Sequence, residues 1–159
     1  MPHVHEGLQE AGNGRFAVVV ARFNDSITKG LLEGAISTLS EAGVSDENLD
    51  VVWVPGAFEI PLIAHKIACT GEYAAVLCLG AVIRGDTTHD QHINRAVSLG
   101  IVEASLSSGV PVLFGVLTCD TLEQALNRSS PGEHNKGAEC ARSALEMASL
   151  IERLSPDQE

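Results

Sequence analysis

A polar turn that directly follows a buried strand is the part of this chain best suited to do chemistry. The apolar run from Val76 to Ile83 is typical of a central strand. The residues from Arg84 to His89 then supply a guanidinium, a glycine, a carboxylate, two hydroxyls and an imidazole, at the point where the strand should end and a helix begin. In open α/β sheets, ligands bind at such junctions. The turn is therefore predicted to belong to an active site.

The groups in this turn suit proton transfer and anion binding. His89 is the candidate proton carrier, because imidazole titrates at about pH 6.5 and both donates and accepts protons at cellular pH. The free backbone N–H groups and the threonine hydroxyls at the helix start could hold a phosphate. Asp86 would oppose an anion, however, and a simple helix cap is the better explanation of the turn taken by itself. His89 and His92 also form an H-x-x-H pair, but no third ligand follows at a suitable spacing, so no metal site is predicted.

Other candidate residues follow the remaining apolar runs. Phe23 could stack on a planar ring, or pack on its own helix as a rim residue. Glu59 could accept hydrogen bonds from a ligand, or stabilise the first turn of a helix, and Gly56 permits a close approach of the backbone. Arg128 and Lys136 flank a Ser-Ser-Pro-Gly loop and favour anion binding there. Since the carboxyl ends of parallel strands share one sheet edge, that edge is the predicted site.

The elements that must position these residues alternate along the chain. Apolar β-type runs alternate with segments of helical periodicity, which predicts a parallel sheet with helices on both faces. The expected fold is α/β, a flavodoxin-like three-layer α/β/α sandwich with a central four-stranded parallel sheet. The predicted strands are Phe16–Ala21, Leu49–Val54, Ala74–Ile83 and Val110–Leu117. The predicted helices run from Asp25 or Ser26 to Gly43, from near Phe58 to near Gly71, from after Thr88 toward Ser108, around Thr121 to Leu126 with a cap at Asp120 or Thr121, and over about Asn135 to Leu154.

Length and composition define the class of protein. The 159 residues suit one domain, expected over 15–159, after a flexible N-terminal arm over 1–14. A formal charge of −11 disfavours nucleic acid and anionic membranes as partners. The apolar runs are shorter than the roughly 20 residues of a membrane span, and the arm lacks the apolar core of a secretory signal. A cytoplasmic protein is expected, and its four cysteines, which form no C-x-x-C pair, are predicted to be buried reduced thiols.

Taken together, these residues resemble the lumazine synthase family. The resemblance covers nearly the whole chain after Arg15, and its motifs occur in the family's order. The motifs are Arg22-Phe23-Asn24, Val54-Pro55-Gly56-Ala57-Phe58-Glu59-Ile60-Pro61, Gly80-Ala81-Val82-Ile83-Arg84-Gly85, Thr88-His89, Phe114-Gly115-Val116-Leu117-Thr118 and Asn135-Lys136-Gly137. Each motif alone is weak, but the ordered set is specific.

The resemblance implies a reaction. It is the condensation of 5-amino-6-(D-ribitylamino)uracil with 3,4-dihydroxy-2-butanone 4-phosphate to 6,7-dimethyl-8-ribityllumazine, phosphate and water, the penultimate step of riboflavin biosynthesis, with no metal and no organic cofactor. His89 matches the proton donor, and Phe23 matches the residue that stacks on the pyrimidine. The residues matching those that hold the ring and the ribityl chain are Ala57, Phe58, Glu59, Ala81, Val82 and Ile83. Asp86, Thr87 and Arg128 match the site for the phosphorylated butanone. Phe114 matches an aromatic supplied by the neighbouring subunit. Lys136 and Glu139 match charged residues near the site.

The resemblance also implies a homo-oligomer. A ring of five subunits is expected, alone, in multiples or as a sixty-subunit shell, with riboflavin synthase as a candidate associated protein. The arm and the loop from Ser129 to His134 bear on this choice without deciding it. One segment departs from the family, which often has an aromatic, an acid and a tyrosine after the histidine, whereas this chain has Asp90 to Arg95 in the sequence Asp-Gln-His-Ile-Asn-Arg.

Two other functions compete with this one. A sister transferase on the same fold would dismutate lumazine to riboflavin. A flavin-binding or cage-forming protein would lack activity, but assembly alone would not require Phe23, Glu59, His89 and Arg128 together.

Overall fold

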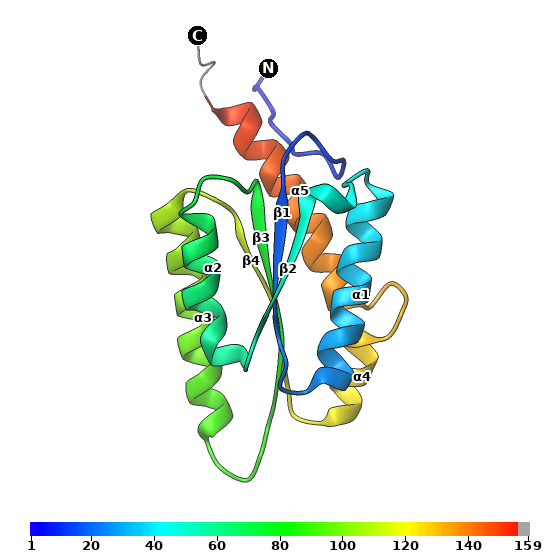
Figure 1. Cartoon of the computed structure of the whole chain (residues 1–159), viewed down its shortest axis with the longest axis vertical. Helices are drawn as coiled ribbons and strands as arrows, with labels where there is room; N and C mark the ends of the chain where they lie inside the picture. The colour runs from blue at the N-terminus through cyan, green and yellow to red at the C-terminus, as the bar shows by residue number, and fades with distance from the viewer. Residues whose placement is uncertain (156–159) are drawn as a thin grey trace.

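The computed structural model describes residues 1–155, so the last four residues of the predicted domain lie outside the described part. Its centre is a parallel four-stranded sheet in the order β2-β1-β3-β4 (Figure 1). The strands are β1 (Phe16–Ala21), β2 (Leu49–Val54), β3 (Ala75–Ile83) and β4 (Val112–Cys119). Because all four strands run the same way, their carboxyl ends form one edge, here called the carboxyl edge, and their starts form the amino edge.

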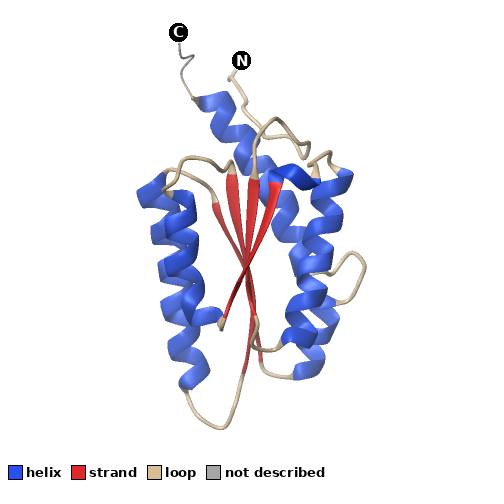
Figure 2. Ribbon diagram, viewed as in Figure 1, coloured by secondary structure: helices blue, strands red, loops and turns tan. Residues whose placement is uncertain are grey.

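Helices cover both faces of the sheet, so the predicted three-layer α/β/α sandwich is confirmed (Figures 1 and 2). One face carries α1 (Asp25–Glu41), α4 (Leu122–Ser129) and α5 (Lys136–Leu154). The other carries α2 (Ile60–Ala68) and α3 (His89–Ser108). Two short 3-10 turns, η1 (Asp46–Asn48) and η2 (Ala57–Glu59), precede β2 and α2.

The core lies in two layers separated by the sheet. Val18 and Val20 pack with Leu31 of α1 on one side, whereas Val19 packs with Ile60 and Val97 on the other. Every residue of β1 is buried. This two-sided burial is why the strand is a continuous apolar run without polar alternation.

Several element boundaries differ from the sequence prediction; for example, β3 begins at Ala75 and not at Ala74, and α4 ends at Ser129 and not at Leu126. β4 begins at Val112 and not at Val110, because the Ser105 hydroxyl at the end of α3 donates to the Val110 carbonyl (3.0 Å) and accepts from the Val112 N–H (3.1 Å). Val110 therefore belongs to a turn. The helix expected to begin near Phe58 is preceded there by the η2 turn, and α2 itself starts at Ile60 with proline in its first turn.

The two predicted helix caps had opposite outcomes. α4 is capped by Thr121, whose hydroxyl accepts from the Gln124 N–H at 3.2 Å while the Gln124 side chain binds the Thr121 N–H. For α1, neither Asp25 nor Ser26 is the cap. The position is held by Asn24, which has φ 64° and makes no side-chain cap bond.

A polar cluster joins three strands at the amino edge. Arg15, just before β1, and the Tyr73 hydroxyl, just before β3, both donate to Oδ2 of Asp50 in β2, each at 2.6 Å. The Arg15 guanidinium also lies over the Tyr73 ring, 5.1 Å from its centre. The hydrogen bond to Asp50, with burial and the nearby carboxylate charge, raises the pKa of Tyr73 above its ordinary value.

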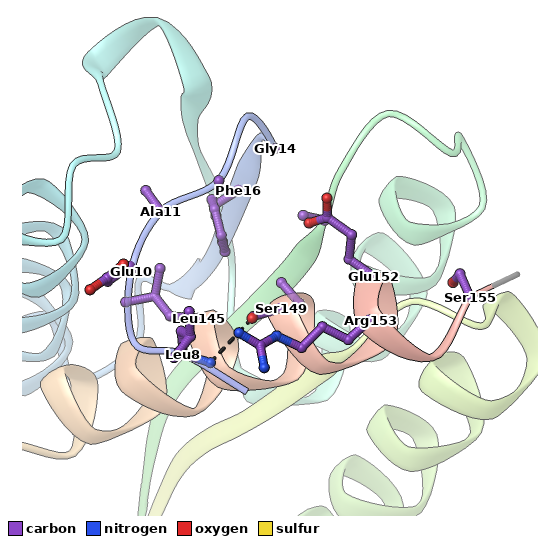
Figure 3. Close-up of a pocket in the computed structure, with 13 residues that line it drawn as sticks. Leu8, Glu10, Ala11, Gly14, Phe16, Leu145, Ser149, Glu152, Arg153 and Ser155 are labelled. Atoms are coloured by element: carbon purple, nitrogen blue, oxygen red, sulfur yellow. Dashed lines mark hydrogen bonds between the residues drawn. The ribbon is translucent and has the colours of Figure 1, made fainter. Parts of the chain in front are cut away.

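The N-terminal residues 1–14 contain no helix or strand and lie against α5 at the amino edge (Figure 3). The Leu8 N–H donates to the Ser149 hydroxyl at 3.1 Å, and the Ala11 N–H donates to the Ala42 carbonyl at 3.0 Å. Arm and helix together line a cavity of about 480 Å³. Across residues 1–155, no helix has the length and apolar character that crossing a bilayer would require.

Candidate functional site

A pocket of about 400 Å³ opens at the carboxyl edge of the sheet. Its walls are the residues after β1, the η2 turn, the end of β3 with the following loop, and the first turns of α3. The predicted site residues that line it are Phe23, Ala57, Phe58, Glu59, Ala81, Val82, Ile83, Thr87 and His89. The structure therefore brings together candidates from three separate strand ends.

Two exposed aromatic rings line this pocket. Phe23 is 71% exposed and Phe58 is 61% exposed, although large apolar side chains are normally buried. Phe23 is held by its backbone, because its N–H donates to the Pro55 carbonyl at 3.0 Å beside the end of β2. An exposed ring on a fixed backbone suits stacking on a planar ligand.

Asn24 also lines the pocket, although no role was predicted for it from the sequence. Its side-chain amide donates to the Ala81 carbonyl at 2.9 Å, which links the turn after β1 to the end of β3. The sequence feature that could have pointed to Asn24 is an asparagine between a predicted strand and a predicted helix, because asparagine adopts positive φ more readily than most residues.

Glu59 and Gly56 lie close together at the η2 turn. The Glu59 N–H donates to the Gly56 carbonyl at 3.3 Å, and a Cβ added to Gly56 would lie 3.4 Å from a Glu59 carboxylate oxygen. Gly56 has an extended backbone with φ −152°, a conformation that any residue adopts. The exposed Glu59 carboxylate is thus free to accept hydrogen bonds from a ligand.

The loop after β3 and the start of α3 form the remaining wall. The Arg84 N–H donates to the Cys119 carbonyl at 2.8 Å, which extends the pairing of β3 with β4 before the loop leaves the sheet. Thr88 occupies the cap position of α3 without a side-chain cap bond, while the Thr87 hydroxyl accepts from the His89 N–H at 3.3 Å. His89 is exposed, and Ile93, one turn further along the same helix, also lines the pocket.

Several predicted site residues lie outside this pocket in the single chain. Asp86 is exposed in the same loop but does not line the cavity. The others belong to β4, α4 and α5: Phe114, Arg128, Lys136 and Glu139. Lys136 and Glu139 form an ion pair at 3.2 Å. Because Arg128 and Lys136 lie elsewhere, no lysine or arginine among residues 1–155 lines the pocket.

The cysteines and metal-binding residues stand apart from this pocket. Burial raises the pKa of the Cys78 thiol well above its ordinary value and that of Cys140 to about 12, so both are unreactive. Cys119 is half-buried, and the prediction of a buried thiol is wrong for Cys69, which is exposed beyond the last residue of α2. In the described part of the chain, no three His, Cys, Asp or Glu side chains gather as a metal site.

Comparison with known proteins gives a consistent result. The model of the 6,7-dimethyl-8-ribityllumazine synthase family matches residues 13–152. The chain is 53% identical over 150 residues to the chloroplastic 6,7-dimethyl-8-ribityllumazine synthase of Arabidopsis thaliana, an alignment that covers 94% of this chain and 66% of that protein. It is 50% identical over 153 residues to the 6,7-dimethyl-8-ribityllumazine synthase of Desulfatibacillum aliphaticivorans, covering 96% of this chain and 99% of the relative. With its fold, its strand-end motifs and these relatives in agreement, the chain belongs to the 6,7-dimethyl-8-ribityllumazine synthase family.

Proposed function

We propose that the pocket at the carboxyl edge condenses 5-amino-6-(D-ribitylamino)uracil with 3,4-dihydroxy-2-butanone 4-phosphate to give 6,7-dimethyl-8-ribityllumazine, phosphate and water. The observation that carries this proposal is the meeting of Phe23, Glu59 and His89 in one pocket of a chain that matches the family over nearly its whole length. The reaction is a transferase step of riboflavin biosynthesis.

The uracil ring stacks on Phe23 in this proposal. Ala57 to Glu59 and Ala81 to Ile83 hold the ring and the ribityl chain, which is supported by their positions on two walls of the same pocket. The exposed Glu59 carboxylate suits the N–H and O–H groups of this substrate, because an ionised carboxylate only accepts hydrogen bonds.

The phosphorylated ketone binds beside the loop before α3. Thr87 lines the pocket near the start of a long helix, where unpaired N–H groups attract anions. Asp86 lies in the same loop. We assign the missing positive charge to Arg128 of a neighbouring subunit, since Arg128 does not line the pocket of its own chain.

A second copy of the chain completes the site by the same reasoning. Phe114, Lys136 and Glu139 belong to β4 and α5, which supply nothing to the pocket of their own chain. We propose a ring of five subunits, or a multiple of five up to a sixty-subunit shell, in which these residues face a neighbour's pocket. Light scattering measures the assembly, and a stable, fully active monomer would contradict the shared site.

The chemistry needs alignment and proton transfer. One amine condenses with the ketone to an imine, phosphate leaves from the derived enamine, and the second amine closes the ring with loss of water. Each step moves protons, and His89 is the pocket's candidate to move them. Holding two substrates together supplies most of the acceleration, with His89 adding about 10²–10⁴-fold.

The remaining parts of the proposal concern organisation and location. Residues 15–159 form one domain, with residues 1–14 as a separate arm. The protein works in the cytoplasm, and riboflavin synthase, which consumes the product, is a candidate associated protein.

The test is incubation of the purified protein with both substrates while lumazine fluorescence is followed. Product from ribitylaminouracil plus butanone phosphate is the expected result. Riboflavin formed from lumazine alone would instead identify the sister transferase. If neither forms, the chain is a binding or cage-forming protein.

A further inference from the structure

Asn135, the cap residue of α5, is a buried polar residue whose side chain bonds to three segments of the chain. It is 2% exposed. Its Nδ2 group donates to the carbonyls of Gly30 in α1 (3.1 Å), Ser129 at the end of α4 (3.0 Å) and Ser130 (3.2 Å). Its Oδ1 accepts from the Ala138 N–H at 3.0 Å, which caps α5. The opposite orientation of the amide would set Oδ1 against three carbonyl oxygens, so the hydrogen bonds fix which way it points.

Two glycines allow the helices to approach closely enough for these bonds. A Cβ added to Gly34 of α1 would overlap the side-chain amide of Asn135. A Cβ added to Gly137 of α5 would overlap the Leu31 carbonyl of α1. The four hydrogen bonds of the Asn135 side chain, here called the asparagine clamp, therefore join α1, the end of α4 and the start of α5 in a contact with no spare room.

The joined segments carry charged residues that the proposed function assigns to a neighbour's pocket. Arg128 immediately precedes Ser129 in α4, and Lys136 and Glu139 lie in the first turn of α5. The connecting residues 130–134 are all exposed, whereas Asn135 is buried. An exposed loop does not by itself fix the relative position of two helices, so the clamp holds Arg128 in place relative to α5.

Helix capping alone does not explain the bonds of Nδ2. A cap needs only an acceptor oxygen, which serine, threonine or aspartate supplies as well as asparagine. The Nδ2 donors reach outside α5, to α1 and to the end of α4. Groups that bind a substrate must be held close to their productive geometry, and the clamp is suited to that task.

We propose that Asn135 is a positioning residue, which holds Arg128 of its own subunit in the orientation that binds the phosphorylated ketone in the neighbour's pocket. This inference rests on the proposed function and adds to it a residue that touches no substrate. Asn135 does not line the pocket at the carboxyl edge, and it acts through Arg128.

Isothermal titration of the assembled full-length protein with 3,4-dihydroxy-2-butanone 4-phosphate tests the clamp without turnover. Asn135→Ala is expected to raise Kd for this ketone about tenfold, because a displaced guanidinium loses its charge-assisted hydrogen bonds to phosphate. Kd for the aminouracil should stay within about twofold of the wild type, since a mispositioned Arg128 leaves the stacking surface intact. Asn135→Asp keeps the cap oxygen but not the Nδ2 donors, and it should bind the ketone as weakly as Asn135→Ala. A wild-type Kd in Asn135→Asp would show that only the cap matters.

A second variant and a control separate positioning from stability. Gly34→Ala displaces the Asn135 amide without removing it, so it should also raise Kd for the ketone, although alanine favours a helix interior. Ser105→Ala removes two hydrogen bonds near the start of β4, at the opposite edge of the sheet. It should lower Tm and leave Kd unchanged for both substrates.

A mixture of two variants tests whether Asn135 serves the neighbouring pocket. His89→Ala subunits have an impaired pocket and an intact clamp, whereas Asn135→Ala subunits have the reverse. In randomly mixed rings, about a quarter of the sites join an intact pocket to an intact clamp. At a ketone concentration below the KM of Asn135→Ala, lumazine formation should therefore exceed the mean of the two parent variants. No recovery would place the effect of Asn135 within its own subunit and overturn the proposal.

Three outcomes of the titrations would also overturn it. They are an unchanged Kd for the ketone in Asn135→Ala, an equal loss of affinity for both substrates, and a loss that accompanies dissociation of the oligomer in light scattering. The last outcome would assign the clamp to assembly. A wild type that binds the ketone but forms no lumazine would refute the proposed reaction, and Kd alone would then decide the role of Asn135. A wild type that binds no ketone would refute both.

Discussion

The side-chain amide of Asn24 donates a 2.9 Å hydrogen bond to the main-chain carbonyl of Ala81, so the residue after Phe23 is attached to the end of β3. Among residues 1–155, Asn24 is also the only non-glycine residue with positive φ. Two walls of the pocket, which come from strands separated in sequence, are thereby held together by one side chain. The position of Phe23 relative to the Ala81–Ile83 wall depends on this contact.

Replacing Asn24 should therefore reveal two separable effects. Asn24→Ala loses the hydrogen bond and places a Cβ in a left-handed conformation, for an expected destabilisation of about 2 kcal/mol. Asn24→Gly loses only the hydrogen bond and should cost about 1 kcal/mol. Urea unfolding at one fixed protein concentration measures both. Equal losses in the two variants would show that the positive φ carries no strain.

Replacing His89 should slow turnover without abolishing it. His89→Ala is expected to lower kcat by about 10²–10⁴-fold, because proton transfer contributes about that much while alignment of the substrates persists. His92→Ala is the control, since this exposed histidine on the same helix does not line the pocket. Lumazine fluorescence gives the rates. Complete loss of activity with an intact assembly would show that alignment is not the main contribution.

Replacing Phe23 should weaken binding of the aminouracil and spare the fold. The ring is 71% exposed, so Phe23→Ala removes little core packing, and we expect a Kd about tenfold higher with an unchanged Tm. Leu106→Ala is a matched control, as Leu106 is an exposed apolar residue of α3 outside the pocket. An unaltered affinity in the titration of Phe23→Ala would rule out stacking.

The Tyr73–Asp50 hydrogen bond should make stability depend on pH in the alkaline range. The pKa of Tyr73 is raised in the folded state, chiefly by this bond, so its contribution is fully present below the ordinary pKa of 10.0 and is lost as pH rises through the higher folded value. Tyr73→Phe should lower stability by about 0.5–1 kcal/mol near neutral pH, and the difference should vanish at high pH.

Absorbance at the phenolate band tests the cause directly, since Tyr73 is the chain's single tyrosine. Its titration midpoint should lie above 10.0 in the native protein and move down in Asp50→Asn. A midpoint that is unaffected by Asp50→Asn would assign the raised pKa to burial alone.

Much of the fold was predictable because its strands are apolar runs of distinct bounds. The runs that predicted β1 and β2 match their observed bounds; β1 is buried throughout because helices cover both of its sides, whereas β2 lies at the sheet edge and includes Asp50. The misplaced boundaries depend on contacts that no local pattern contains. Asn24 replaces Asp25 at the start of α1 through a contact with Ala81, and the start of β4 depends on the Ser105 side chain of α3.

The site was predictable in part for a related reason. Parallel strands bring their ends to one edge, which is enough to place Phe23, Glu59 and His89 in one pocket. Arg128 and Phe114 could not be placed in this way, because both lie outside the pocket of their own chain and their proposed partners belong to another copy.

The N-terminal arm and the end of α5 lie at the amino edge of the sheet (Figure 1). The pocket, in contrast, opens at the carboxyl edge. A protein or peptide fused ahead of Met1 would emerge on the side of the molecule opposite the chemistry. The same separation allows the chain to be immobilised through its amino terminus with the pocket still facing solution. The polarity of the parallel sheet thus makes this chain a natural scaffold for attaching cargo without blocking substrate entry.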